Sequence, residues 1–332
     1  MGSPALTGLH DRLGAAASRA GRSGFLILGL SILLFLALAP FTPALASKGN
    51  ALNLVGNLVP LFVVATGLTV VLISGGMDLS LTSIIALTSV VGAMVMNGDT
   101  GWLAGSPLAA PTAVAVMLLL GAAAGLINGV AVALLRMPAF IVTLTTMMFF
   151  SGLAIWISQS KPVDRLPDGF IALGSRPGIA VGIAAVLGGW AHLMLTRSLF
   201  GRWLHAVGQN PRTARVSGVP VAGVLIAAYV VSGVFAAAAS VLYTARLETG
   251  SPVHGQRLLL DVLGATVIGG TSLFGGRGRV AWTLCGVLFL TLLDNALNLL
   301  GLSHFTIMMV KGGVILLAAL LDGWRSRMLY GS

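Results

Sequence analysis

Charged residues are scarce in this chain of 332 residues, because Asp, Glu, Lys and Arg together make up only 8% of it. A soluble domain carries about 25% charged residues, so water cannot be the only solvent of this chain. Aromatic residues reach 7%, and no acidic–aromatic cluster of the kind that holds a sugar tightly is present. The single cysteine, Cys285, excludes an intramolecular disulfide and a thiolate metal cluster.

What the chain has instead is apolar sequence, at 57% of residues and a mean hydropathy of +0.99. Its apolar blocks are long enough to cross a hydrocarbon core as helices, and they lack the alternating pattern of barrel strands. We therefore predict an all-α fold, a polytopic transmembrane helical bundle of about 10 spans (8–10). The expected spans are 24–45, 53–73, 80–97, 110–135, 138–159, 179–196, 219–243, 260–274, 280–300 and 304–321.

Two of these blocks differ from a regular span. The eighth is short and rich in glycine, which predicts a broken or re-entrant helix. The second opens with Asn53, Asn57 and Pro60, which also favours an irregular segment. The first block is longer than the apolar core of a signal peptide, although Ala44-Leu45-Ala46 fits a cleavage pattern.

The distribution of basic residues predicts the topology. Ten spans place both termini on one side, which then collects twelve arginines against six Lys and Arg on the other. The positive-inside rule therefore predicts cytoplasmic termini and a multi-pass protein of the cell inner (plasma) membrane. The same rule explains the net charge of +10 without a nucleic-acid partner. We expect a cytoplasmic tail at 1–23, one permease domain at 24–322 and a second cytoplasmic tail at 323–332.

The segment 197–218 is the most informative stretch, because it is basic and lies between two long apolar blocks on the predicted cytoplasmic side. Asn210 and Pro211 predict the cap and first turn of a short helix that carries Arg212 and Arg215. Such a helix can dock into a groove on a partner protein. The alternative is an ordinary cytoplasmic loop whose arginines contact lipid headgroups.

The motifs of an enzyme are missing. The glycine-rich run Gly269 to Arg279 departs from the phosphate-loop pattern, since Gly275 is followed by Gly276-Arg277 and no soluble strand precedes it. The five histidines are scattered through the sequence and form no cluster with acidic residues: His10, His192, His205, His254 and His304. We predict no covalent chemistry, no catalytic residue and no metal site in this chain.

Charges inside apolar blocks are costly and mark candidate functional or structural positions. Asp78 follows an apolar span directly, where it can cap the next helix or act in gating. Asp294 and Lys311 lie at matching distances from the turn near 302–303 of a predicted helical hairpin. We expect these two residues to form a structural ion pair, and a proton or cation relay is the alternative.

The polar residues in the spans are the candidates for a translocation path or gate, although each is also a candidate for a helix–helix hydrogen bond. They are Asn57, Asp78, Ser80, Asn128, Thr143, Thr145, Asn295 and Asn298. The run from Asn50 to Gly56 recurs as Asn295 to Gly301, but a biased composition raises chance matches of this kind.

Four stretches together resemble a known family, the bacterial ATP-binding-cassette (ABC) importer permeases of the ribose/galactose/xylose group, which includes furanose-sugar permeases. Gly75-Gly76-Met77-Asp78-Leu79-Ser80 is similar to that group's Gly-Gly-Ile-Asp-Leu-Ser signature. Ala206 to Val219 resembles its cytoplasmic coupling segment, and Pro138 to Leu144 resembles its Pro-x-Phe-Ile-x-Thr-Leu stretch. Val267 to Gly278 matches its C-terminal part, together with 295–301 and 310–312. Leu259 departs from the family, which normally has Glu there, and leucine does not supply that carboxylate near the outer mouth.

The resemblance implies a permease subunit that moves a monosaccharide delivered by a periplasmic or extracellular binding protein. It implies a second permease subunit, in a homo- or heterodimer, and a separate cytoplasmic ABC ATPase that binds ATP, so that this chain itself holds no cofactor. The residues that it assigns to ATPase coupling are His205, Gly208, Gln209, Asn210, Pro211, Arg212, Thr213, Ala214, Arg215, Ser217 and Gly218. The alternative function is an ion-coupled secondary transporter of a small polar solute, which needs intramembrane carboxylates such as Asp78 and Asp294.

Overall fold

The computed structural model describes residues 25–256 and 258–330, with side chains through residue 320. The predicted tail at 1–23 and residues 331–332 lie outside the described residues. Within the described part, the secondary structure is helical apart from one isolated β-bridge between Val163 and Gly250. Six helices are long and apolar enough to cross a membrane, and four shorter helices are apolar too. The predicted all-α polytopic bundle is confirmed.

The chain order begins with an apolar helix at Phe25–Leu38 and a 3-10 turn, η1, at Pro43–Ala46. The six long helices are α2 (Lys48–Ile73), α4 (Ala109–Ala133), α5 (Ala139–Ser158), α7 (Pro177–Arg197), α10 (Val221–Leu247) and α12 (Val280–Leu299). The others are α3 (Leu81–Met96), α6 (Asp168–Ser175), α8 (Leu199–Gln209), α9 (Pro211–Val216), α11 (Leu258–Ile268) and α13 (His304–Tyr330).

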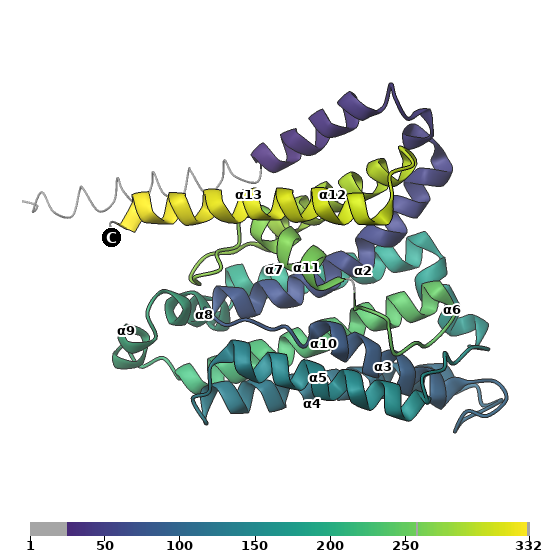
Figure 1. The fold of residues 1–332 in the computed structure, drawn as a ribbon. Helices are drawn as coiled ribbons and strands as arrows, with labels where there is room; N and C mark the ends of the chain where they lie inside the picture. The colour runs from purple at the N-terminus through teal and green to yellow at the C-terminus, as the bar shows by residue number, and fades with distance from the viewer. Residues whose placement is uncertain (1–24, 257, 331–332) are drawn as a thin grey trace, which may run out of the picture.

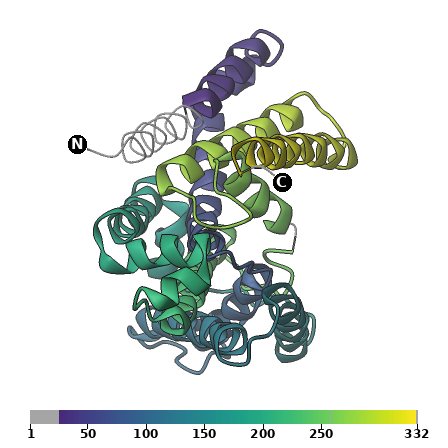
Figure 2. The same ribbon diagram turned by 90° about the vertical axis from the view of Figure 1, so that its left-hand side faces the viewer.

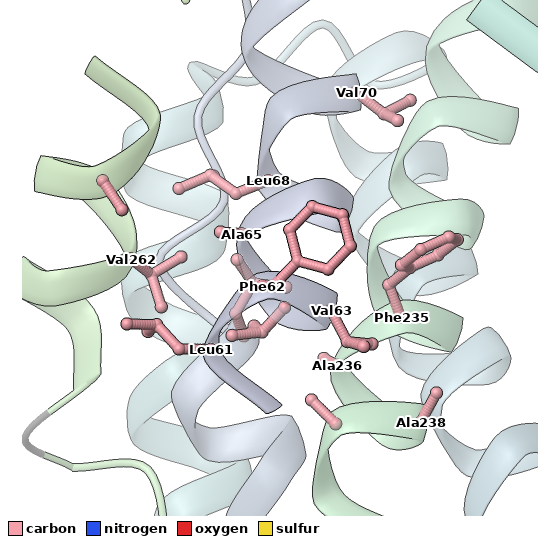
Figure 3. Close-up of a cluster of buried hydrophobic side chains, with 14 of the residues drawn as sticks. Leu61, Phe62, Val63, Ala65, Leu68, Val70, Phe235, Ala236, Ala238 and Val262 are labelled. Carbon is pink, nitrogen blue, oxygen red and sulfur yellow. The ribbon is translucent and has the colours of Figure 1, made fainter. Parts of the chain in front are cut away.

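Helix α2 runs through the middle of the bundle, and its side chains from Val59 to Ile73 are buried. Figure 3 shows its apolar side chains between Phe235 of α10 on one flank and Val262 of α11 on the other. The irregular second span that we predicted is wrong, because α2 continues unbroken through the buried Pro60. A proline removes one backbone hydrogen bond from a helix, and apolar packing on all sides of α2 offsets that loss.

Two predicted spans are shorter in the structure than the sequence suggested. The eighth span ends at Ile268 rather than at 274, because Gly270, Gly275 and Gly276 have φ of +89°, +88° and +72°. Only glycine adopts such angles without strain, and they are incompatible with a continued helix. The short, interrupted character predicted for this span is therefore correct. The first apolar helix also ends early, at Leu38, where Pro40 and Pro43 follow.

The bundle has two distinct ends (Figure 1). Helices α8 and α9 lie together at one end, which we call the near end, and α13 terminates on the same side. Helix α6 and the loops after α3 and α5 lie at the opposite end, which we call the far end. Figure 2 views the bundle from the near end, with α8 and α9 toward the viewer. Helices α2, α11 and α13 therefore begin at the far end, whereas α10 and α12 finish there.

Candidate functional site

Helices α8 and α9 form a capped helical pair at the near end, and each cap is a polar side chain that precedes its helix. The Ser198 hydroxyl accepts a hydrogen bond from the Gly201 amide at 3.1 Å. The Asn210 side chain accepts from the amides of Arg212 and Thr213, at 2.9 and 3.1 Å. Both caps satisfy backbone groups that a helix start leaves unpaired. The short helix predicted after Asn210 is therefore present.

One side of this pair is exposed and the other is anchored. The side chains of Leu204, Val207 and Ala214 are buried against the bundle. The exposed residues carry most of the positions expected to couple to a partner: Gln209, Asn210, Pro211, Arg212, Thr213, Arg215, Ser217 and Gly218. His205 and Gly208 are half-buried, and the His205 ring contacts the Gly201 carbonyl at 2.8 Å. Val216, between Arg215 and Ser217, is 86% exposed.

The anchored side of α8 rests on a junction of glycines. The α2 helix ends at Ile73, and its last carbonyl accepts a hydrogen bond from the Gly276 amide at 2.8 Å. Gly208 packs directly on the same carbonyl, where any side chain would overlap the Ile73 oxygen. Gly275 lies against Gly75, so that a Cβ there would be 2.8 Å from the Gly75 Cα. The exposed pair therefore contacts the α2–α3 break and the α11–α12 loop at one point, which we call the glycine junction.

The α2–α3 break continues from the glycine junction to Asp78, which is fully buried. One carboxylate oxygen of Asp78 accepts from the Ser80 amide at 3.0 Å and from the Ser80 hydroxyl at 2.6 Å. The other accepts from the Ser232 hydroxyl of α10 at 2.8 Å. Asp78 lies two residues before Ser80, the N-cap position of α3, so it supports the start of that helix without occupying the cap itself.

Further hydrogen bonds tie this break to α4 and α5. The Asn128 amide of α4 donates to the Ser80 hydroxyl at 2.8 Å, and Thr146 of α5 donates to Asn128 at 2.8 Å. Thr143 of α5 and Tyr229 of α10 both donate to the Met77 carbonyl, at 3.3 and 3.2 Å. Four path candidates that are each fully buried (Asp78, Ser80, Asn128 and Thr143) thus lie in one network. Each has a protein partner there, and together they fix four helices around the α2–α3 break.

The remaining path candidates lie elsewhere. Thr145 is exposed on α5, and its hydroxyl bonds to carbonyls of its own helix at 2.9 Å. Asn57 is exposed near the far end and accepts from Arg246 at 2.8 Å. Asn295 exchanges two hydrogen bonds with Asn50, at 2.8 and 2.9 Å. The two similar runs seen in the sequence therefore meet at their first residues.

Asn298 and the predicted ion pair also lie toward the far end. Lys311 Nζ lies 2.9 Å from Asp294 and 2.7 Å from Asp261 of α11. Asn298 donates to the second oxygen of Asp294 at 3.2 Å. The sequence reasoning paired Asp294 with Lys311 and missed Asp261. The signal was available, since Asp261 is the one acidic residue in its apolar block.

The loops of the far end are joined by backbone bonds. Val163 and Gly250 exchange two hydrogen bonds of 2.8 and 2.9 Å, and the Asn97 amide donates to the Asp164 carbonyl at 2.6 Å. Arg165 pairs with Asp99 on the same surface. Among the described residues no group of three His, Cys, Asp or Glu side chains is placed to hold a metal ion.

This arrangement of apolar helices around a buried central helix defines a multi-pass membrane protein. The chain belongs to the family described as "Branched-chain amino acid transport system / permease component", whose model matches residues 50–319. It is a transmembrane permease subunit, as the resemblance implied.

Individual relatives cover most of the chain. The ribose import permease protein RbsC of Escherichia coli (strain K12) is 36% identical over 302 residues, which is 88% of this chain and 92% of that protein. RbsC of Bacillus subtilis (strain 168) is 36% identical over 313 residues, 90% of this chain and 92% of that protein. The L-arabinose transport system permease protein AraH of Escherichia coli (strain K12) is 35% identical over 310 residues, 89% and 88% of the two chains. No solved structure is significantly similar to this chain.

Proposed function

We propose that this chain is the inner-membrane permease of an ABC importer for a monosaccharide, driven by a separate ATPase that binds the ATP. The observation that carries the proposal is the placement of α8 and α9. Their exposed side presents Arg212, Arg215 and Val216, and their buried side packs on the glycine junction. A helical pair whose outer side is exposed and whose inner side packs on the bundle can transmit the movement of a bound protein to the bundle.

The glycine junction supplies a route for that force. Movement of α8 pushes on the Ile73 carbonyl, and through Gly276 it pushes on the α11–α12 loop. The α2–α3 break is held to α4, α5 and α10 by Asp78 and Ser80, so these helices move with it. ATP-driven closure of the ATPase pair then changes the bundle between two arrangements around the solute path.

The substrate class follows from relatives of high similarity, which are named for ribose and L-arabinose. The description of the family names branched-chain amino acids, so these are the competing substrates. We favour a monosaccharide because the identity reaches 35–36% over about nine tenths of the chain. A second permease copy completes the path, and the far-end loops receive a binding protein that delivers the sugar.

The direct test is the energy source of transport. The permease is reconstituted in proteoliposomes with its ATPase and binding protein, and uptake of D-ribose, L-arabinose and L-leucine is measured. We expect sugar uptake that requires hydrolysable ATP on the ATPase side and persists when ionophores collapse ion gradients. Uptake that needs a proton or sodium gradient and proceeds without ATP supports the ion-coupled alternative instead. Uptake of L-leucine and of neither sugar would support the ABC importer assignment and refute a monosaccharide as its substrate.

A further inference from the structure

A strip of polar and charged groups crosses the far half of the bundle on partly exposed helix faces. Asn57 of α2 is exposed about 14 Å along the helix from Lys48. Arg246 of α10 reaches across to it, and its guanidinium donates to the Asn57 side-chain oxygen at 2.8 Å. The same guanidinium lies against Gly56, where any side chain would collide with it. The glycine therefore makes room for Arg246 on the face of α2.

The charged cluster of α11, α12 and α13 continues this strip. Asn50, two turns before Asn57 on α2, exchanges two hydrogen bonds with Asn295, the residue after Asp294 on α12. Asp261 holds Lys311, which in turn holds Asp294. We call the resulting set the far-end polar strip, and its members are Asn57, Arg246, Asp261, Asp294, Asn298 and Lys311.

Membrane lipid is an unsuitable neighbour for this strip. Lys311 lies about 10 Å along α13 from His304, well inside the helix. The Asp294 side chain is nevertheless 40% exposed. A charged group in hydrocarbon costs at least about 2.5–3.5 kcal/mol, and such groups in membrane helices face protein or a water-filled cavity. The strip therefore borders water or a second protein surface.

A buried hydroxyl lies close to the strip in the sequence of α12. Thr291 lies one turn before Asp294 on the same face of α12, and its side chain is 94% buried, at 6% exposure. Among the described residues its hydroxyl has no hydrogen-bond partner. Buried hydroxyls in native proteins are almost always paired, so Thr291 is an unsatisfied polar group one turn from Asp294.

We propose that the far-end polar strip is a sugar-hydroxyl site in the solute path, reached from the far side of the membrane. The proposal deepens the proposed function and rests on it. The strip carries two carboxylates against one guanidinium and one ammonium, so its formal charge cancels. A neutral site with strong donors and acceptors suits an uncharged solute that is rich in hydroxyl groups.

The strip offers both acceptors and a donor for the hydroxyl groups of a sugar. Each Asp294 oxygen already accepts one bond, from Lys311 or from Asn298, and a carboxylate oxygen has room for a second donor. A sugar hydroxyl supplies such a donor. No described residue accepts from the Asn57 amide nitrogen, which leaves that donor for a hydroxyl oxygen. These bonds replace water around the sugar after its release from the binding protein.

The test uses the accessibility of introduced thiols in the full transporter. Cys285 is the only cysteine, so Cys285→Ser gives a background free of thiols in this chain. Cysteine is then placed at Asn57 or, in a second variant, at Asn298. A membrane-impermeant methanethiosulfonate reagent is added from the far side. The matched control is Leu119→Cys on α4, a 70% exposed apolar position.

We expect Asn57→Cys and Asn298→Cys to react at least about tenfold faster than Leu119→Cys, since the reaction needs a hydrated thiolate. A monosaccharide that the complex takes up, chosen among D-ribose, L-arabinose, D-xylose and D-galactose, should slow the reaction about tenfold at ten times its half-saturating concentration. L-Leucine should give no protection.

The outcomes separate the two proposals. If the complex takes up none of these sugars, the proposed function fails. If it takes up a sugar while both cysteines stay as unreactive as Leu119→Cys, or react without protection by that sugar, the site is wrong and the proposed function survives. Protection by L-leucine and by no sugar also overturns the site, because it assigns the strip to a zwitterion.

Discussion

Gly208→Ala tests whether α8 drives the bundle through the glycine junction. The new methyl group would overlap the Ile73 carbonyl oxygen and lie 2.5 Å from the Gly276 amide nitrogen. Both neighbours are backbone atoms, and the new Cβ would lie only 1.8 Å from the Ile73 oxygen, so α8 has to withdraw by about 1.6 Å to reach an ordinary contact distance. Overpacking of this kind costs about 1–3 kcal/mol. A change of that size shifts the equilibrium between coupled and uncoupled states about 5- to 150-fold.

The assay measures sugar uptake and ATP hydrolysis together in the reconstituted complex. We expect Gly208→Ala to lower the sugar transported per ATP at least about fivefold while the complex still hydrolyses ATP. Gly223→Ala on α10 is the matched control, because a Cβ there meets no atom within 4 Å. If Gly208→Ala transports as much sugar per ATP as Gly223→Ala, the glycine junction does not carry the force.

Three further predictions concern buried charges and one histidine. Asp78→Asn should retain sugar uptake. Asp78→Ala should lower the yield of folded protein, because alanine leaves three hydrogen-bond donors unpaired at about 1–3 kcal/mol each. Loss of uptake in a well-folded Asp78→Asn variant would favour the ion-coupled transporter. Lys311→Met should destabilise the protein by about 3–5 kcal/mol, because it leaves two carboxylates without their cation. Neutralising Asp261 and Asp294 in the same variant should restore the melting temperature in detergent. An unrestored melting temperature would refute the ion cluster. Burial lowers the pKa of His254 below its usual 6.5, so thermal stability should fall as the pH drops below about 6.5. His254→Asn should make the melting temperature less dependent on pH in this range. An unchanged pH dependence in that variant would contradict the role of His254.

The sign of the His254 effect follows from its pKa. A histidine whose pKa is lowered by folding binds its proton more readily in the unfolded chain, so acid favours unfolding. The neutral ring contacts the Ser89 hydroxyl of α3 at 3.2 Å from the loop after α10. The same Ser89 oxygen accepts from Thr244 at 2.7 Å and contacts the Ser251 amide at 3.3 Å. Protonation therefore weakens the attachment of that loop to the bundle.

Most of the bundle was predictable because apolar blocks report directly on helices that cross a membrane. The predicted block 280–300 matches α12, and the cap and proline at 210–211 placed α9. Composition does not reveal how many sides of a helix are packed, so the regular course of α2 through Pro60 was missed. The helices α6 and α8 were also missed, because they are short and flank longer apolar blocks.

The candidate site was only partly predictable, since its contacts join residues far apart in sequence. The pairing of Asp294 with Lys311 was predicted from their matching depth on neighbouring helices. That reasoning considered only one helical hairpin, so it did not include Asp261 of α11. The glycine junction depends on the close approach of three separate segments. No local pattern shows that Gly208 lies on Ile73, because each glycine alone is also typical of an ordinary turn.

The measurement that tests the central claim most directly is co-purification of the ATPase with the tagged permease. Arg212→Ala with Arg215→Ala removes two cations from the exposed near-end pair. Lys161→Ala with Arg176→Ala removes two exposed cations at the far end and serves as the control. We predict that the near-end variant loses most of its ATPase and its ATP-driven uptake, while the far-end control retains its ATPase. Undiminished association and uptake in the near-end variant would contradict the assignment of α8 and α9 as the surface that receives the ATPase.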